Sequence, residues 1–244
     1  LDDMTAHGKD SHLAALDAHP NIEVRLFNPS RSRAGVLGRA SEMLLRPVAM
    51  NRRMHNKAWI ADGRVAVVGG RNVGDEYFDA AAQTNFLDLD AVLVGPAVRQ
   101  TSAIFDDFWN SASVIPLAAL SGAEEGALAR LRAHGDAGYR STRAADYVAR
   151  LRSSPGLPAL VGGNALHWLD EVGVYSDPAA KGQGEGKAQW LVHRLGRAMG
   201  LAKRELRVIS PYFVPGEEGT RWLVGKRAQG VDVSVLTNSL AAND

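Results

Sequence analysis

Residues 54–72 contain the pattern that most constrains how this chain can fold. Two runs rich in strand-forming residues flank the dipeptide Asp62-Gly63. Asp-Gly is a strong signal for a two-residue β-hairpin turn, because both turn positions need positive φ angles that these residue types adopt at low cost. The expected register pairs Ala61 with Arg64, Trp59 with Ala66, Lys57 with Val68 and His55 with Gly70.

This hairpin would gather polar groups on one face of a sheet. Because side chains alternate along a strand, His55 and Lys57 share a face and lie about 6.5 Å apart. Gly70 lies opposite His55 on that face, and Asn72 projects the same way if the strand continues. An imidazole, a fixed cation, an amide donor and the uncovered backbone at Gly70 together suit a bulky anion such as phosphate.

The spacing from His55 to Asn72, His-x-Lys-x4-Asp-x6-Gly-Gly-x-Asn, resembles the HKD motif of the phospholipase D superfamily. The flanking residues 51–54 and 71–78 are similar to those of the bacterial cardiolipin synthases, and most similar to the C-type branch. The resemblance covers nearly the whole chain and is strongest over residues 50–96.

In this superfamily, one motif histidine attacks phosphorus to form a phosphohistidine, and the histidine of a second motif protonates the departing alcohol. The resemblance favours His55 as the nucleophile and Lys57 as the cation beside the phosphate. Gly70 and Asn72 would hold phosphate oxygens. Asp62 completes the motif, but its expected place in the turn, roughly 20 Å of strand from His55, indicates a turn-forming role. The family pattern implies no metal and no other cofactor.

A nucleophilic imidazole is usually held at its other nitrogen by a carboxylate. Asp88 is the candidate, because it is a polar residue on the apolar segment 86–94 and follows the motif about as closely as the family's orienting acid tends to. Asp90 would share a strand face with Asp88 and could serve instead. Glu76 is a further candidate, and its alternative role is on a helix surface.

Strand and helix patterns alternate along the chain, which predicts the α/β class. Residues 21–27 match 230–236 position for position as a strand, and a helix precedes each. The superfamily fold is a duplicated α/β/α sandwich with a mixed sheet and one motif per lobe. The resemblance therefore implies a first lobe at 1–113, an inter-lobe insertion and linker at 114–186, and the start of a truncated second lobe at 187–244. We expect the chain to be a fragment.

Within this plan, the periodicity predicts individual elements. Helices are expected at 13–18, 75–82, 96–111, 123–133, 141–152, 188–202 and 218–229. Strands are expected at 22–27, 86–94, 206–213 and 231–238. The helix at 188–202 is predicted to bury its apolar residues Trp190, Leu191, Leu195 and Met199.

Composition narrows the function classes. The chain has 28 Lys and Arg against 27 acidic residues, whereas a dedicated nucleic-acid-binding protein usually has a clear basic excess. The absence of cysteine excludes disulfides, thiolate zinc sites and a cysteine nucleophile. A basic segment could meet anionic lipid headgroups or be ordinary solvated surface; it contains Arg31, Arg33, Arg39, Arg46, Arg52 and Arg53.

The resemblance to the bacterial cardiolipin synthases implies a metal-independent phosphatidyltransferase of that type. Its substrates would be phosphatidylglycerol and a second phospholipid, with phosphatidylethanolamine as one option. It would act at the membrane surface in the bacterial cell envelope, peripheral to the inner membrane. A phospholipase D or nuclease that uses water as the acceptor has the same hairpin and is the first alternative. An inactive fragment that lacks the second motif is the other. The sequence predicts no oligomeric state.

Overall fold

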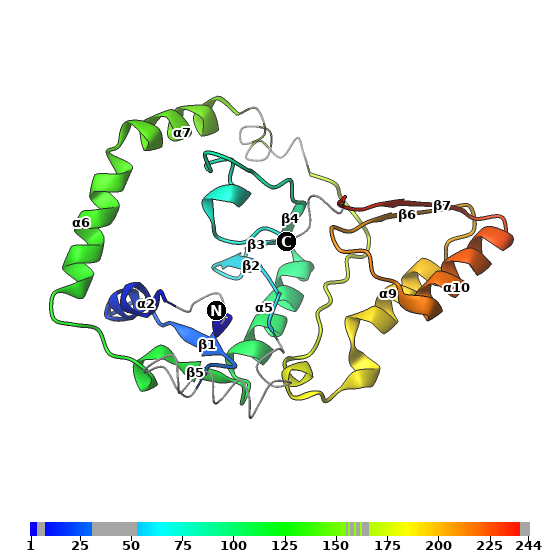
Figure 1. Cartoon of the computed structure of the whole chain (residues 1–244), viewed down its shortest axis with the longest axis horizontal. Coiled ribbons are helices and arrows are strands. Elements are labelled where there is room, and N and C mark those ends of the chain that lie inside the picture. The colour runs from blue at the N-terminus through cyan, green and yellow to red at the C-terminus, as the bar shows by residue number, and fades with distance from the viewer. Residues whose placement is uncertain are drawn as a thin grey trace. The chain divides into compact units, whose positions relative to one another are not determined.

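The computed structural model describes residues 1–3, 8–30, 53–154, 156, 159, 162 and 166–239. Of the predicted basic segment, only Arg53 falls among them; the arginines at 31–52 lie outside the described residues. The chain divides into two compact units, Leu1–Lys187 and Ala188–Asp244, which are drawn together in Figure 1. The lobe and insertion boundaries implied by the family resemblance stay predictions.

The first unit begins with a small α/β assembly. It consists of helix α2 (Asp10–Asp17), strand β1 (Arg25–Phe27), strand β5 (Val114–Pro116) and the 3₁₀ turn η2 (Leu117–Ala119). β1 pairs antiparallel with β5, and Phe27 also forms a parallel bridge with Asp2. The side chains of Ala14, Val24, Leu26 and Leu117 pack together as the buried cluster of this assembly.

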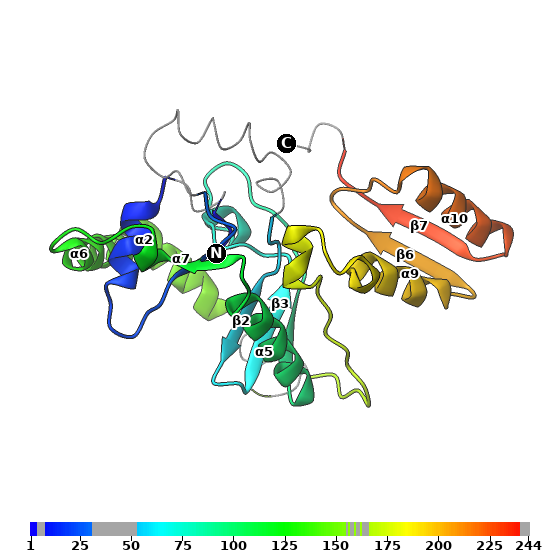
Figure 2. The ribbon, with the colours of Figure 1, turned by 90° about the horizontal axis from the view of Figure 1, so that it is seen from below.

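The second assembly of this unit is a three-stranded antiparallel sheet in the order β2-β3-β4. Its strands are β2 (Ala58–Ala61), β3 (Val65–Gly69) and β4 (Asp90–Val94), and helix α5 (Pro96–Trp109) follows directly. α5 packs on one face of the sheet, where Ala66 and Val98 are fully buried (Figure 2). The opposite face exposes Trp59, Val65 and Val92.

The turn between β2 and β3 has the predicted chemistry but not the predicted length. Asp62 and Gly63 both adopt positive φ angles, of 53° and 64°. However, Ala61 pairs with Val65 rather than with Arg64, so the loop has three residues and the expected register is wrong by one. Because side chains alternate along a strand, this shift puts Gly69 and Arg71 on the Lys57 face in place of Gly70 and Asn72.

The segment between β3 and β4, which we call the 75–86 loop, contains less regular structure than expected. The helix predicted at 75–82 is a single 3₁₀ turn, η1 (Asp75–Tyr77), and Asp79 has a φ of 57° that no helix can continue. The strand expected from Phe86 begins only at Asp90, because the Phe86 N–H bonds to the carbonyl of Glu76 at 2.8 Å. The loop therefore closes on itself before the strand starts.

Two helices follow the second assembly, near the positions predicted. They are α6 (Ala127–Tyr139) and α7 (Thr142–Ser153). α6 contacts both α2 and α7. The hydroxyl of Ser141 caps α7 by accepting a hydrogen bond from the Ala144 N–H at 3.2 Å. A short 3₁₀ turn, η3 (Ala179–Gln183), lies near the end of the unit, and a second, η4 (Lys187–Gln189), crosses the boundary to the next unit.

The second unit is a helix followed by a parallel β-α-β motif. Its elements are α9 (Leu191–Gly200), β6 (Glu205–Ile209), α10 (Gly216–Ala228) and β7 (Asp232–Leu236). β6 and β7 are parallel, and the Nζ of Lys226 on α10 donates to the carbonyls of Gly200 and Ala202, at 2.6 and 3.2 Å, at the end of α9. A cation at a helix C-terminus is favourable because carbonyl groups there lack partners.

The burial predicted for the helix at 188–202 is only partial, since Trp190, Leu191 and Met199 are half-buried. Leu195 is 50% exposed, and Trp190 precedes the helix as its N-cap residue. The two-stranded sheet of this unit is too small to cover the apolar face that the sequence gives α9.

The predicted internal repeat has a counterpart in the fold. In the first unit α2 lies between Asp2 and Phe27, which bridge in parallel; in the second, α10 lies between parallel strands β6 and β7. The mixed α/β class is confirmed. The strands of the described residues form three small sheets, and the duplicated α/β/α sandwich with a mixed sheet stays a prediction. No helix within the described ranges is long and apolar enough to cross a membrane.

Candidate functional site

A cavity of about 410 Å³ opens on the face of the β2-β3-β4 sheet opposite α5. It is lined by two cations, one carboxylate, three apolar side chains and a glycine: Lys57, Arg71, Asp90, Trp59, Val67, Phe78 and Gly69. Among these lining residues, Lys57 is a predicted site residue.

Lys57 is a half-buried cation at the entry of β2. Its Nζ donates a hydrogen bond to the main-chain carbonyl of His55 at 2.8 Å. Partial burial lowers the pKa of Lys57 below its ordinary value, and Arg53 adds to this. The attraction of Asp88 and Asp2 offsets part of the lowering. Two carboxylates therefore act on Lys57: that of Asp88, which the sequence analysis proposed as a site residue, and that of Asp2, which it did not.

His55 lies just before β2, and its side chain is exposed. Its ring forms no hydrogen bond with the residues that the structure describes. The backbone immediately before it is held by the buried carboxylate of Asp2, which accepts from the Met54 N–H at 2.8 Å and pairs with Arg53 at 3.3 Å. An accessible imidazole on an anchored backbone is a suitable arrangement for a nucleophile.

Asp88 and Gly70 come together as a contact across the sheet end. A Cβ atom added at Gly70 would lie 2.7 Å from Cγ and 2.8 Å from Oδ2 of Asp88, so the carboxylate occupies the space that a side chain would fill. The predicted pairing of Asp88 with the His55 ring is not among the hydrogen bonds of the described residues; Oδ1 of Asp88 accepts from the Leu89 N–H at 3.0 Å.

The side chain of Asn72 bonds to Tyr77 and is not on the Lys57 face, where the predicted register would have let it bind a phosphate oxygen. Its Nδ2 donates to the hydroxyl of Tyr77 at 2.7 Å, and the residue itself is exposed. Asn72 therefore connects the end of β3 to the 75–86 loop. Asp62 lies in the hairpin turn, at the opposite end of β2 from His55. Of the predicted site residues, Lys57 bonds to the main chain of His55 and Asp88 lies against Gly70, while Asp62 lies at the far end of the hairpin.

Arg71 is the residue that the sequence reasoning missed. Its Nε pairs with Asp90 Oδ2 at 2.6 Å, Nη2 donates to the Asp88 carbonyl at 3.4 Å, and Nη1 donates to the carbonyl of Tyr77. The guanidinium also lies 5.5 Å from the ring centre of Phe78. The Gly-Gly-Arg-Asn string is visible in the sequence, but only the one-residue register shift puts its arginine on the Lys57 face.

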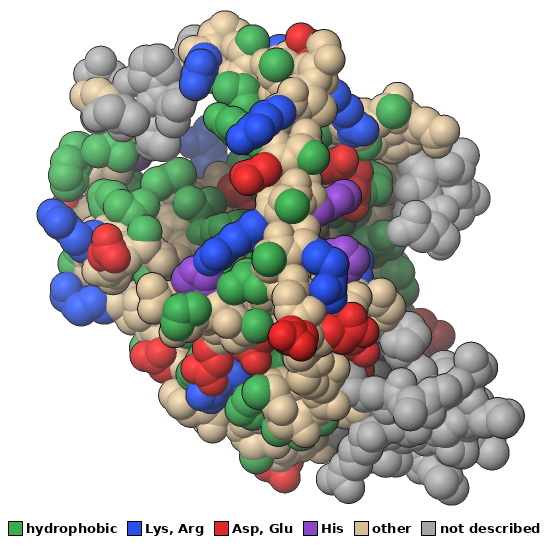
Figure 3. Space-filling view, turned by 90° about the vertical axis from the view of Figure 1, so that its left-hand side faces the viewer, with side chains coloured by type: hydrophobic (Ala, Val, Ile, Leu, Met, Phe, Trp, Pro, Cys, Tyr) green, Lys and Arg blue, Asp and Glu red, His purple; other side chains and the backbone are tan. Residues whose placement is uncertain are grey.

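One face of the molecule carries charges of both signs (Figure 3). On the face of the molecule shown in Figure 3, Lys and Arg side chains alternate with Asp and Glu instead of forming one basic area. Among the residues that the structure describes, no three His, Cys, Asp or Glu side chains form a group that could hold a metal ion.

Comparison with known proteins gives relatives along the whole chain. It is 39% identical over 253 residues to cardiolipin synthase C of Escherichia coli K12, and 30% identical over 256 residues to an uncharacterised protein of Helicobacter pylori strain J99. Cardiolipin synthase 1 of Staphylococcus aureus strain MRSA252 is 33% identical over 93 residues, 37% of this chain and 19% of that protein.

The alignments with the first two relatives include 100% of this chain, but 51% and 48% of those proteins. The chain therefore spans about half the length of these relatives. No family model matches the chain, and no solved structure matches it. The similarity to cardiolipin synthase C, which extends along the whole of this chain, supports a relationship with the bacterial cardiolipin synthases.

Proposed function

We propose that this chain carries one half of the active site of a phosphatidyltransferase of the cardiolipin synthase type, in the phospholipase D superfamily. The observation that carries the proposal is the 39% identity to cardiolipin synthase C along the entire chain. The substrates would be phosphatidylglycerol and a second phospholipid, with phosphatidylethanolamine as one option. The protein would work at a membrane surface in the cell envelope. The duplicated two-lobe fold belongs to the same proposal.

In the proposed first step, an imidazole nitrogen of His55 attacks the phosphorus of a phospholipid. A nitrogen–phosphorus bond forms, the phosphorus–oxygen bond to the departing alcohol breaks, and that alcohol takes up a proton from a second acid. In the second step the hydroxyl of the acceptor lipid attacks the phosphohistidine, gives its proton back to the group that served as the acid in the first step, and releases His55 as the nitrogen–phosphorus bond breaks. Lys57 balances the phosphate charge throughout. The accessible ring and the neighbouring half-buried cation support these roles.

Asp88 is retained in the proposal as the acid that orients His55. Its effect on the pKa of Lys57 supports a place in the same electrostatic field. Gly70 contributes by leaving room for the Asp88 carboxylate, and Asn72 by fixing the end of β3 to Tyr77. A phosphate could then approach Lys57 from the face of the sheet that Lys57 shares with Gly69 and Arg71.

The direct test supplies phosphatidylglycerol vesicles to the chain and, in parallel, to the complete product of its gene. Lipid products are separated by thin-layer chromatography. Cardiolipin would support transfer. Phosphatidic acid without cardiolipin would indicate hydrolysis and replace the proposal by a phospholipase D activity. If the complete protein forms neither cardiolipin nor phosphatidic acid, both the transferase proposal and the phospholipase D alternative are refuted.

Lys57 gives the transfer rate a defined dependence on pH. The protonated amine is the form that attracts phosphate, and its pKa lies below the ordinary lysine value of 10.5. We therefore expect the rate to fall as the pH rises through that lowered pKa, earlier than an ordinary lysine would cause. Lys57→Arg should extend the plateau to higher pH, because a guanidinium stays protonated. Superimposable alkaline limbs for the two proteins, measured as initial rates, would exclude Lys57 as their cause.

Asp62 should prove to be a turn residue and not a catalytic one. It has a φ of 53° and no side-chain hydrogen bond with the described residues. Asparagine also adopts positive φ readily, so Asp62→Asn should keep both activity and stability. Asp62→Val should lower the free energy of unfolding by about 1 kcal/mol or more, because β-branched residues are strained there. Loss of activity in a fully folded Asp62→Asn variant would restore a chemical role.

A further inference from the structure

We infer that Arg143 and Arg150 of helix α7 are positioning residues that hold the 75–86 loop in place beside the candidate site. This inference deepens the proposed function and, in its effect on substrate, rests on it. Neither arginine belongs to the HKD-like motif, and both come from the region at 114–186 where the sequence analysis placed an insertion.

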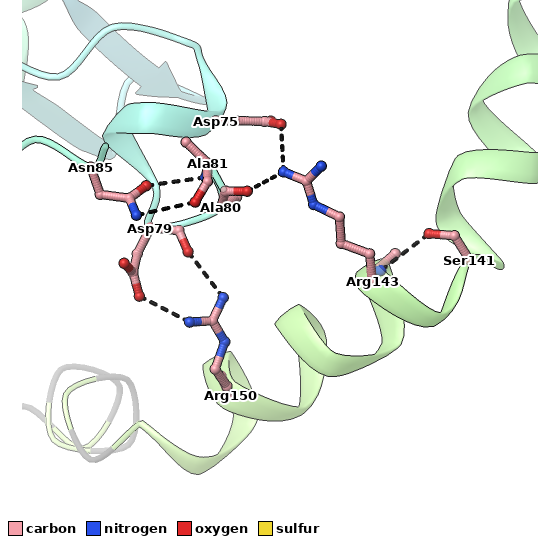
Figure 4. Close-up of polar contacts among 9 residues, drawn as sticks. Asp75, Asp79, Ala80, Ala81, Asn85, Ser141, Arg143 and Arg150 are labelled. Atoms are coloured by element: carbon pink, nitrogen blue, oxygen red, sulfur yellow. Dashed lines mark hydrogen bonds and ion pairs between the residues drawn. The ribbon is translucent and has the colours of Figure 1, made fainter. Parts of the chain in front are cut away.

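The two arginines bind the loop through four contacts, at Asp75, Asp79 and Ala80 (Figure 4). Arg143 Nη2 pairs with Asp75 Oδ2 at 3.2 Å and also donates to the Ala80 carbonyl. Arg150 Nη1 pairs with Asp79 Oδ2 at 3.0 Å, and its Nη2 donates to the Asp79 carbonyl at 2.9 Å. Seven residues separate the two arginines, which is close to two helical turns, so both project from one face of α7.

Contacts within the 75–86 loop connect the residues bound by α7 to the residues that face the candidate site. Asn85 exchanges two hydrogen bonds with Ala81, at 3.1 and 3.3 Å. The rings of Tyr77 and Phe86 pack with centroids 5.1 Å apart. With the Phe86 N–H bonded to Glu76, the segment behaves as one closed piece.

The inner side of the loop touches the candidate site directly. Tyr77 accepts from Asn72 through its hydroxyl and from Arg71 through its carbonyl. Phe78 lies over the Arg71 guanidinium and forms part of the cavity wall. A displacement of the loop would therefore move a wall of the cavity and release the end of β3.

The contacts between the arginines and the loop are exposed to solvent, so their strength depends on the salt concentration. The arginine side chains are 65% and 58% exposed, and their acidic partners 72% and 75%. Exposed ion pairs contribute little one at a time and are screened by salt. The two arginines lie on one helix and act together, however, and each also donates to a main-chain carbonyl. Arg150 is further steadied by the ring of Tyr147, 5.7 Å away.

The first test measures amide hydrogen exchange in the Arg143→Ala/Arg150→Ala double variant by mass spectrometry. We expect peptides within 75–86 to exchange roughly tenfold faster than in the parent, while those of the hairpin at 58–69 keep their rates. Arg→Lys at both positions should give intermediate rates, because lysine keeps the charge but not the fork. Arg152→Ala is the matched control, since Arg152 is exposed on α7 without a bond to the described residues.

Unchanged exchange in the double variant, equal acceleration in Arg152→Ala, or equal acceleration of the hairpin would each overturn the inference. Raising the salt concentration to about 0.5 M should move the parent toward the double variant. The double variant could exchange faster than the parent even though added salt leaves the exchange rate of the parent's loop unchanged. That result would show that the hydrogen bonds from the arginines to main-chain carbonyls hold the loop, and the ion pairs would be removed from the inference.

The second readout is phosphatidyl transfer. The double variant should raise KM about fivefold with kcat within twofold of the parent, because the loop shapes the cavity and does not touch the reacting atoms. The Arg→Lys pair should recover part of the KM. Unchanged KM in an active protein with a loosened loop would overturn the positioning role. If the complete gene product makes no cardiolipin yet its loop exchange responds as expected, the proposed function fails and the attachment of the loop stands.

Discussion

Replacing His55 with alanine is expected to reduce phosphatidyl transfer by at least about 10⁴-fold, because the proposed reaction has no covalent intermediate without this nucleophile. The side chain is exposed, so the variant should fold like the parent and its circular dichroism spectrum should be unchanged. The measurement is the initial rate of cardiolipin formation from phosphatidylglycerol. A second measurement, retention of labelled phosphate on the protein after rapid quenching at alkaline pH, should lose its signal in the same variant.

His134→Ala is the matched control for this experiment. His134 lies on α6, is exposed, and has no bond to the described residues, so its removal should leave the rate within twofold of the parent. Parent-level turnover by His55→Ala would sink the assignment of the nucleophile. A comparable loss in His134→Ala would indicate that the assay reports general damage.

The second large effect is a loss of stability when Gly69 is replaced by alanine, which should be greater than the loss caused by the same change at Gly70. A Cβ at Gly69 would lie 2.5 Å from the Leu89 carbonyl oxygen and 2.7 Å from the Cα of Asp90, both main-chain atoms of the β4 side. Main chain in a ladder cannot move aside cheaply, so Gly69→Ala should lower the free energy of unfolding by about 1–3 kcal/mol. Urea unfolding followed by circular dichroism measures this directly.

At Gly70 the obstructing atoms belong to the Asp88 carboxylate, which can rotate away. Gly70→Ala should therefore cost less than about 1.5 kcal/mol of stability. It should instead move the carboxylate away from Lys57, lower the pKa of that lysine further, and shift the alkaline limb of the rate profile to lower pH. Gly122→Ala is the control, because nothing lies within 4 Å of a Cβ there. Equal losses of stability in the two variants would contradict this account.

Local chemistry made parts of this fold predictable. Asp62-Gly63 determined where the chain turns, since both residues adopt the positive φ that the turn requires. Gly95-Pro96 similarly predicted the start of α5, which begins at Pro96. The alternation of Val231 to Leu236 predicted β7 within two residues of its observed ends.

What could not be predicted depends on contacts distant in the sequence. The loop of three residues instead of two is a difference of one hydrogen-bond register, which the strand pattern does not encode. The helix predicted at 75–82 fails because Asp79 takes a left-handed conformation within a loop bound by Arg150, 71 residues away. Asp2 holds the backbone before His55 across 52 residues. No local propensity contains these partners.

The attachment of the 75–86 loop to α7 has a consequence for how such proteins diverge. The loop borders the cavity, but the residues that hold it lie 68 and 71 residues further along the chain. Substitutions in α7 can therefore reshape the entrance of the site while every residue of the HKD-like motif stays the same. Two proteins with identical motifs could in this way come to prefer different acceptor lipids, and a comparison confined to the motif would miss the change.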